Sequence, residues 1–416
     1  MPGAGSGVDP LGPVFISYRS SDGADLAYKV ARALRCAGAP VWHDQEDLPP
    51  GDTRTRLQEA LARGLSGAVL VVTPEIEHSS VVRDVELPEL LRLHTDPDFI
   101  FVVASTLERA GQPGRLDFDA PDRLLAQPPD TFKWLKQFPL FEPDSCEKVA
   151  ERIVRRRMDS HRRLGEETLV IDLQTRSSPQ AFTNQTALVV RTPPPKEGFR
   201  APSPETWPPL RSFLAALPAL VEASGAKRVL LRGGAHLSAA FALGAALPAT
   251  GRAGPLAVED QNQVVWEALE TGAPAELTVD EKDLGSPRRP VAVLVDLVPT
   301  IPPTDAFGEL LESRTTDYSA SLRMRLAQPR RLVPEEIGAT TAAIASLIRN
   351  FAGRHDTNEI HLFLRTPFPA AVLLGRLFNT LRVTLYELEG SVGRSQYLPA
   401  ITVSSGLGGG PIVAIF

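Results

Sequence analysis

The C-terminal part of the chain contains a duplication, and this feature constrains the fold most strongly. The segment LVIDL (169–173) resembles VLVDL (293–297), and RVLLRGGAHLSAAFALGAAL (228–247) resembles EIHLFLRTPFPAAVLLGRLF (359–378). Within the longer segments the aligned residues are Ala239-Ala240, Leu243 and Gly244 with Ala370-Ala371, Leu374 and Gly375. Each copy reads as a strand, a helix, a second strand, a loop and a further helix. The sequence therefore predicts two Rossmann-like α/β halves that pack about a pseudo-two-fold axis and bring their strand-end loops together.

The first strand-end loop carries residues suited to an anionic ligand. Gly233 and Gly234 allow backbone amides to approach a phosphate closely. His236, Leu237 and Ser238 open a helix, whose N-terminus favours anions. We expect these five residues to contact a phosphate-bearing ligand. A tight turn is the alternative explanation for the glycines, and a structural cap is the alternative for His236.

The second strand-end loop offers a different set of contacts. Arg365 supplies a cation, Thr366 a hydroxyl and Phe368 an aromatic face for a base. Lys196, in a proline-rich loop, and Tyr397, near the C-terminal end, are expected to add phosphate and base contacts. A solvated lysine and a core tyrosine are the alternatives at these two positions.

The N-terminal region alternates strand and helix from Val14 onward. Short apolar runs separated by helical patterns predict a parallel sheet with crossover helices. In such sheets ligands bind beyond the carboxyl ends of the strands, so we expect a functional site at that edge. Polar segments directly follow three of the predicted strands, at 17–22, 44–51 and 74–80.

Charge and composition exclude several classes of function. The 416 residues include 44 Lys and Arg against 50 Asp and Glu, a net charge of −6, whereas proteins that bind long nucleic acid are usually basic. Cys36 and Cys146 lie far apart without zinc-ligand spacing, so we expect neither a disulfide nor a metal site. No run approaches the roughly 20 apolar residues of a membrane span. We expect a cytoplasmic protein whose first segment, 1–13, is disordered.

Three ordered motifs near the N-terminus resemble the signatures of TIR domains. They are VFISYRSSDG, APVWHDQEDLPPGD and SGAVLVVTPEIEHSSVVRDVEL. The resemblance covers about 14–164 and implies a flavodoxin-like parallel sheet. It also implies that the loop 44–52 is mobile and makes head-to-tail contacts between copies.

In TIR domains that cleave NAD, a glutamate on the helix after the third strand is catalytic, and Glu86 matches its place. The chain lacks the tryptophan that often precedes this glutamate, and Pro88 interrupts the helix, so Asp84 and Glu89 stay open as alternatives. Cleavage of the bond between nicotinamide and ribose builds positive charge on the ribose, which a nearby carboxylate stabilises. A solvated helix position is the alternative role for Glu86.

The same resemblance implies that NAD lies beside the ends of the first two strands. Tyr18 and Trp42 are expected to stack on its rings and Arg19 to meet its pyrophosphate. Core packing of the aromatic residues and a surface ion pair of the arginine are the alternatives. The full set of expected NAD contacts is Ser17, Tyr18, Arg19, Trp42, Asp44, Asp47 and Leu48.

The duplicated region resembles a SAVED domain, the fused pair of CARF-like halves that senses cyclic oligonucleotides in bacterial antiphage systems. The resemblance rests on the paired strand-loop-helix segments and on LYELEGSVGRSQYLPAI near the end. It implies a TIR domain at 14–164 and a SAVED domain at 165–416, with CARF-like halves at 165–285 and 286–416. A chain of this order resembles the TIR-SAVED effectors of CBASS antiviral defence.

This resemblance implies a function for the whole chain. A cyclic oligoadenylate, with cyclic tri-adenylate as the expected ligand, binds the SAVED domain and drives self-association into a filament or superhelix, because head-to-tail contacts do not close. Neighbouring TIR domains then form composite sites that hydrolyse NAD, which is a substrate, and no cofactor is expected. A TIR signalling scaffold without enzymatic activity and a cyclase that makes cyclic ADP-ribose are the alternatives. The ring size, base and linkage of the nucleotide stay open, as does the symmetry of the assembly.

Overall fold

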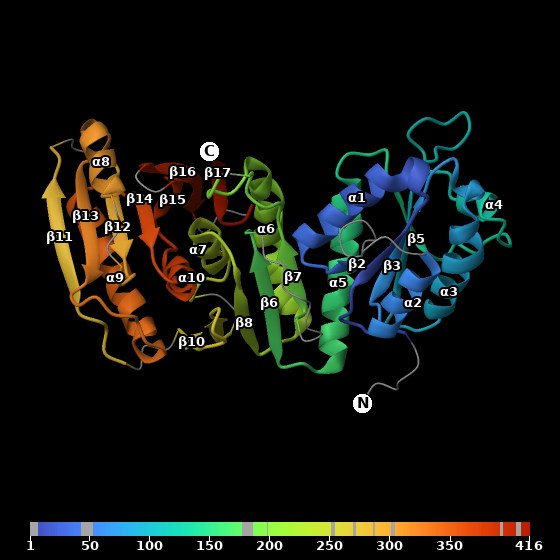
Figure 1. Cartoon of the computed structure of the whole chain (residues 1–416), viewed down its shortest axis with the longest axis horizontal. Helices are drawn as coiled ribbons and strands as arrows, with labels where there is room; N and C mark the ends of the chain where they lie inside the picture. Colours follow the sequence, from blue (N-terminus) through green and yellow to red (C-terminus); the bar gives the residue numbers. More distant parts are fainter. Residues whose placement is uncertain are drawn as a thin grey trace. The chain divides into compact units, whose positions relative to one another are not determined.

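A computed structural model describes residues 7–42, 53–176, 186–197, 199–250, 254–268, 272–285, 288–300, 304–391, 394–404 and 409–416. The chain divides into two compact units. The first consists of Met1–Glu166, Ala181–Val190 and Ala223–Gly225, and the second of Glu167–Gln180, Arg191–Glu222 and Ala226–Phe416. Figure 1 labels the helices and strands of both.

The first unit is built on a parallel five-stranded sheet. Its strands lie in the order β2-β1-β3-β4-β5, which is the flavodoxin-like order. Their bounds are β1 (Val14–Ser17), β2 (Val41–Trp42), β3 (Gly67–Val72), β4 (Ile100–Ser105) and β5 (Lys136–Pro139). All six residues of β3 are buried, as expected for a central strand that helices cover on both faces. The parallel sheet predicted for this region is confirmed.

Helices cover the two faces of this sheet. α2 and α3 supply Ala60, Leu87, Leu90 and Leu93 to a core that also contains Phe15, Leu70 and Phe101 from the strands. α1 and α5 pack against each other and contact β3 and β4 respectively. The bounds are α1 (Ser20–Ala37), α2 (Thr53–Arg63), 3-10 helix η1 (Ile76–His78), π-helix η2 (Val82–Glu86), α3 (Leu87–Leu93), α4 (Ala120–Leu124) and α5 (Ser145–Leu164).

Part of the segment 1–13, for which the sequence predicts disorder, packs onto the first unit. Val8 forms a parallel bridge with Leu65, and the Asp9 amide donates to the Leu65 carbonyl at 3.0 Å. Leu11 is buried. Residues 8–12 therefore add backbone hydrogen bonds and apolar burial beside the start of β3.

The first repeat forms a sheet with the order β10-β9-β8-β6-β7. β6, β8 and β9 are parallel neighbours, and β10 is antiparallel to β9. The bounds are β6 (Thr168–Gln174), β7 (Leu188–Arg191), β8 (Arg228–Gly234), β9 (Leu256–Glu259), β10 (Val265–Glu267), η3 (Pro204–Thr206), α6 (Trp207–Ser224) and α7 (Leu237–Ala246). The predicted strand-helix-strand-loop-helix order is present.

The second repeat forms a seven-stranded mixed sheet with the order β11-β13-β12-β14-β15-β16-β17. β13, β12, β14 and β15 are parallel, whereas β11, β16 and β17 pair antiparallel to their neighbours. The bounds are β11 (Leu277–Asp283), β12 (Val291–Asp296), β13 (Ala320–Leu326), β14 (Glu359–Arg365), β15 (Arg382–Ser391), β16 (Arg394–Ser404), β17 (Ile412–Ile415), α8 (Ala306–Ser313), η4 (Thr315–Asp317), α9 (Pro334–Arg354) and α10 (Phe368–Leu377).

The duplicated helices α7 and α10 pack against each other in the middle of the second unit (Figure 1). A Cβ atom added at Gly244 would lie 1.9 Å from the Val372 carbonyl oxygen, and one added at Gly375 would lie 2.0 Å from the Phe241 carbonyl oxygen. Since Phe241 aligns with Val372 and Gly244 with Gly375 in the duplicated sequence, the contact is reciprocal, as a two-fold relationship requires. The two glycines permit this close approach of the helix backbones.

Candidate functional site

The carboxyl edge of the first sheet brings together Ser17 and Glu86. Ser17 is the last residue of β1, and its Oγ donates a hydrogen bond to Glu86 Oε2 at 2.6 Å. Both side chains are buried, at 1% and 5% exposure. Glu86 therefore does not occupy the solvated helix position considered above. It faces the sheet edge at which the sequence predicts a site.

A π-helical turn sets the direction of Glu86. The Leu87 amide donates to the Val82 carbonyl, five residues back, within η2. Pro88 follows, and proline has no N–H and clashes with the carbonyl four residues before it, here that of Asp84. Widening the turn relieves this clash, and π-turns of this kind are frequent at functional sites. The helix continues through Pro88 as α3 rather than ending there.

The other two carboxylates on this helix lie in different surroundings. Asp84 is exposed and accepts hydrogen bonds from the neighbouring Arg83, which lower the pKa of its carboxyl group. Glu89 is half-buried and pairs with Arg92 three residues later. Neither bonds to the end of β1 in the part of the chain that the structure describes. Of the three candidates, Glu86 has the buried position.

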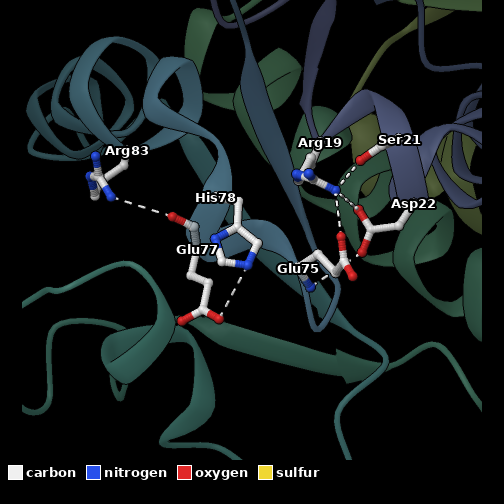
Figure 2. A network of polar contacts seen from close by, with 7 residues as sticks. All are labelled: Arg19, Ser21, Asp22, Glu75, Glu77, His78 and Arg83. Atoms are coloured by element: carbon white, nitrogen blue, oxygen red, sulfur yellow. Dashed lines mark hydrogen bonds and ion pairs between the residues drawn. The ribbon is translucent and has the colours of Figure 1, made fainter.

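Arg19 takes part in a network of charged side chains rather than standing alone (Figure 2). Its Nη1 lies 3.0 Å from Glu75 Oε2 and 3.6 Å from Asp22 Oδ1, and it also contacts the Ser21 hydroxyl. Asp22 in turn accepts a hydrogen bond from the Glu75 amide at 3.3 Å. This is the ion-pair alternative, and a pyrophosphate would have to compete with two carboxylates for the guanidinium.

The remaining NAD candidates fall into two groups. Trp42, at the end of β2, is 5% exposed in the core, with the Arg63 guanidinium 4.8 Å from its ring centroid. Tyr18 is half-buried beside Gly23. Asp44, Asp47 and Leu48, like the whole loop 44–52, lie outside the described residues.

Two buried polar atoms at this edge find no hydrogen-bond partner among the described residues. They are Trp42 Nε1 and Thr73 Oγ1, and Thr73 directly follows β3. Unsatisfied buried donors are costly, which makes them candidates for contact with a ligand. Thr73 is absent from the sequence-based set, although its place after a central strand is a signal that would have found it.

In the second unit, the glycine pair after β8 has a structural explanation. A Cβ at Gly233 would lie 2.0 Å from the Leu173 carbonyl oxygen, and Gly233 has a φ of 142°. The Gly234 amide donates to Gln174 Oε1 at 3.1 Å. The close approach of β8 to β6 thus requires Gly233, and a phosphate would have to displace the Gln174 side chain to reach the Gly234 amide.

His236 is buried and fully hydrogen-bonded within the protein. Its Nε2 lies 2.8 Å from the Arg200 carbonyl oxygen and its Nδ1 lies 2.6 Å from Thr175 Oγ1, while its own amide donates to that same oxygen. Since a carbonyl only accepts, Nε2 carries the proton and Nδ1 accepts from the threonine hydroxyl. Burial lowers the pKa of His236 to about 4, so the ring is neutral at pH 7. It occupies the helix-cap position and is not a cation for a phosphate.

The N-terminus of α7 is occupied by a carboxylate from the second half. Glu387, in β15, accepts from the Ser238 amide at 2.8 Å and from the Ser238 hydroxyl at 2.5 Å. Two residues on, Glu389 accepts from the amides of Arg200 and Ala201. Burial raises the pKa of Glu387, whereas for Glu389 the backbone hydrogen bonds outweigh burial and lower the pKa.

These contacts join the strand-end loop of the first half to the sheet of the second. Glu387 and Glu389 are absent from the sequence-based set. In LYELEG the two glutamates are two residues apart, so in a strand they lie on the same face. This spacing is the sequence signal that could have identified them.

In the second strand-end loop, the Arg365 side chain is bound by other residues of the same half. Arg365 Nη1 lies 2.8 Å from Asp296 Oδ2, and Arg365 Nη2 donates to Thr300 Oγ1 at 2.8 Å. The equivalent aspartate of the first half, Asp172, lies 3.5 Å from Arg232 on the neighbouring strand. The duplicated aspartates thus hold arginines at the carboxyl ends of their sheets.

The last candidates differ in exposure. Thr366 is buried, and its Oγ1 has no hydrogen-bond partner within the described part of the chain, while Phe368 and Leu237 are half-buried at the starts of α10 and α7. Lys196 is exposed. Tyr397 packs edge-on against Phe363 in the core, at 4.9 Å between ring centroids, and burial raises the pKa of its hydroxyl to about 12. In the structure Tyr397 is therefore a core residue, which is the alternative named above.

The described ranges contain neither a cluster of metal-binding side chains nor a membrane-spanning helix. Three or more His, Cys, Asp or Glu side chains do not gather there in a way that would hold a metal ion. None of the helices described is both long and apolar enough to span a bilayer.

Comparisons with known proteins give two family matches. The model of the SAVED domain, a "SMODS-associated and fused to various effectors sensor domain", matches residues 214–403, and a TIR domain model matches residues 14–126. The NAD(+) hydrolase PdTIR of Paracoccus denitrificans is 38% identical over 65 residues, which are 15% of this chain and 22% of that protein. The chain thus covers about a fifth of the length of this curated relative.

The chain is also similar, at low sequence identity, to solved structures. The Cap4 SAVED/CARF-domain containing receptor of Acinetobacter baumannii, in complex with the cyclic trinucleotide 2'3'3'-cAAA, is 14% identical with a TM-score of 0.45, over 78% of this chain and 85% of that one. The Cap4 receptor of Moraxella osloensis is 14% identical with a TM-score of 0.43, over 80% and 86%. On the evidence of the two family matches, this chain carries a TIR domain at its N-terminus and a SAVED domain at its C-terminus.

Proposed function

We propose that this chain is an NAD⁺ hydrolase switched on by a cyclic oligonucleotide. The observation that carries the proposal is the buried carboxylate of Glu86, held by Ser17 at 2.6 Å on the carboxyl edge of a TIR sheet. The NAD(+) hydrolase relative supports the reaction, and the SAVED match supports the sensor. NAD⁺ is the substrate, and the reaction needs no further cofactor.

The proposed reaction assigns one task to Glu86. As the bond between nicotinamide and ribose breaks, positive charge develops on the ribose, and the carboxylate stabilises it electrostatically. Nicotinamide leaves as a neutral group, and water attacks the ribose to give ADP-ribose. A buried carboxylate suits this task because the low local dielectric strengthens its interaction with the developing charge.

The proposed messenger site lies at the strand ends of the SAVED domain, where Arg365 and Thr366 lie beside the start of α10. The Thr366 hydroxyl has no hydrogen-bond partner among the described residues. Cyclic tri-adenylate is the ligand we expect. It can activate only if it binds the assembling form more tightly than the inactive form. Head-to-tail contacts through the TIR loop 44–52 then extend into a filament and complete the NAD site. The biological role we propose is bacterial antiviral defence of the CBASS type, in the cytoplasm.

A single assay tests the proposal. Purified protein is mixed with NAD⁺ and a panel of cyclic di-, tri- and tetranucleotides, and the products are separated by chromatography. We expect nicotinamide and ADP-ribose only with the matching nucleotide, and no turnover by Glu86→Gln.

Asp84→Asn and Glu89→Gln, on the same helix, serve as matched controls and should keep activity. If Glu86→Gln were active and one of these controls inactive, the catalytic role would belong to the residue changed in that control. Cyclic ADP-ribose as the product would indicate a cyclase. Unchanged NAD⁺ in every mixture would leave the non-enzymatic scaffold as the function.

A further inference from the structure

Ser17 and Glu86 are buried side chains that form a direct hydrogen bond. The hydroxyl of the last β1 residue donates to a carboxylate 69 residues later in the chain, at 2.6 Å. This distance lies in the range of charge-assisted O–H···O⁻ hydrogen bonds. Since a hydroxyl has one proton, and that proton is directed to Glu86, Ser17 has no proton left to donate to a substrate.

Burial alone would favour the protonated form of a carboxyl group, which could not stabilise a cationic ribose. A hydrogen bond donated to the carboxylate favours the charged form. The bond also fixes Oε2 against the end of β1 and so fixes the plane of the carboxylate. Two independent elements define this geometry, because β1 holds Ser17 at the carboxyl edge of the sheet and the π-turn directs Glu86 toward it.

We infer that Ser17 is a positioning residue for the reaction proposed above, and that it acts through Glu86 rather than by contacting NAD⁺. Its hydroxyl keeps the carboxylate ionised and oriented. This inference rests on the proposed function for its catalytic consequence. The effect on the ionisation of Glu86 does not depend on turnover.

The experiment compares wild type, Ser17→Ala and Ser17→Thr in the full-length protein. Ser105→Ala is the matched control, because Ser105 is also buried at the carboxyl end of a strand, and its Oγ accepts from the Leu107 amide instead of contacting Glu86. The ionisation of Glu86 is followed by NMR of ¹³C-carboxyl-labelled glutamate, with the resonance assigned through Glu86→Gln. Turnover of NAD⁺ is measured against pH in the presence of the activating nucleotide.

We expect the titration midpoint of Glu86 to move to higher pH in Ser17→Ala and to return in Ser17→Thr, which keeps the hydroxyl. kcat should fall about ten- to a hundredfold in Ser17→Ala, the loss expected for one hydrogen bond to a charged group, with little change in KM. The acidic limb of the pH profile should move with the midpoint. Ser105→Ala should match wild type in all three readings.

An unchanged Glu86 midpoint in Ser17→Ala would overturn the inference, whatever the activity. A raised KM with an unmoved pH profile would also overturn it, since that pattern indicates direct contact with substrate. A shifted midpoint in a protein that leaves NAD⁺ intact with every nucleotide would refute the proposed function and leave the pairing of Ser17 with Glu86 standing.

Discussion

Gly244 in α7 and Gly375 in α10 hold equivalent places in the duplicated sequence, and each lies against the backbone of the other's helix. The reciprocal contact joins the two halves of the SAVED domain through backbone surfaces that no side chain separates. Because the two backbones meet directly, a side chain at either position would force the helices apart.

Gly244→Ala is expected to lower the free energy of unfolding by about 1–3 kcal/mol, the usual cost of overpacking, because its Cβ would meet the Val372 carbonyl at 1.9 Å. Gly353→Ala in α9 is the matched control, since a Cβ there has nothing within 4 Å. The control should be stabilised by up to about 1 kcal/mol through helix propensity. Urea denaturation monitored by circular dichroism measures both. Equal stability of the two variants would show that α7 and α10 do not pack this closely.

Glu387→Gln is expected to bind the cyclic nucleotide several-fold more tightly. The carboxylate occupies the amide of Ser238 at the start of α7 and repels an incoming phosphate, whereas glutamine keeps the shape without the charge. Titration calorimetry with cyclic tri-adenylate measures the change. Glu281→Gln, on the exposed strand β11, is a control of equal chemistry and should bind like wild type. Weaker binding by Glu387→Gln would mean that Glu387 itself accepts a hydrogen bond from the ligand.

Acid should destabilise the SAVED domain through buried His236 and half-buried His361. Burial lowers the pKa values of His236 and His361 to about 4, from about 6.5 in the unfolded chain. Between these values the unfolded state binds more protons, so this stabilising contribution is full above pH 6.5 and is lost as the pH falls to 4. Calorimetric melts of wild type and His361→Gln from pH 7 to 4.5 test this. The difference in stability between them should change with pH, and a constant difference would contradict the neutral state of His361.

The succession of strands and helices in the parallel sheet and in the duplicated segments could be predicted from the sequence, because it follows from local patterns. Apolar runs, helical periodicity and the duplication are each read within a few dozen residues. The partners of the site residues could not be predicted in this way. Glu387 accepts a hydrogen bond from Ser238, which lies 149 residues away in the sequence. Which face of the Glu387 strand contacts α7 depends on how that helix packs. The sequence could show that Glu387 and Glu389 lie on the same face of a strand. It could not show that the N-terminus of a helix contacts that face.

Glu86 illustrates the same limit within one helix. The motif placed a carboxylate after the third strand but left three candidates, and Pro88 counted against a regular helix there. In the structure a π-turn lies directly before that proline, and the carboxylate that reaches Ser17 is that of Glu86. Tyr397 lies in the core, although the sequence suggested a base contact. The sequence alone cannot distinguish an aromatic residue that stacks on a base from one that packs in a core.

Arg157 is expected to contribute strongly to the stability of the first unit. It is a buried cation in α5 whose guanidinium donates to the backbone carbonyls of Leu11, Gly12, Thr186 and Ala187 and to the Ser66 hydroxyl. Burial lowers its pKa to about 10, so it stays charged at pH 7. Arg157→Met removes these hydrogen bonds and should lower the free energy of unfolding by about 3 kcal/mol or more, measured by urea denaturation.

Arg155→Met is the control for that measurement. Its exposed side chain pairs with Glu151 one helical turn away, and the change should stay within about 0.5 kcal/mol. A similar effect of both substitutions would show that the carbonyl contacts of Arg157 add little.

Pro88→Ala is expected to separate stability from activity. Alanine restores an N–H that can bond to the Asp84 carbonyl, four residues back, so the π-turn can close into a regular α-helix. The helix should become at least as stable as in wild type. The side chain of Glu86 should turn away from Ser17, and NAD⁺ turnover should fall about tenfold or more, because a carboxylate displaced by about 1 Å loses much of its effect.

Pro121→Ala, in the first turn of α4, is the matched control for this change. Proline in a first turn interrupts no helical hydrogen bond, so this variant should keep both stability and turnover. Thermal melts and kcat, measured with the activating nucleotide present, decide the outcome. Full activity in a stable Pro88→Ala protein would show that the π-turn is not needed to direct Glu86, and that the end of β1 alone determines where the carboxylate lies.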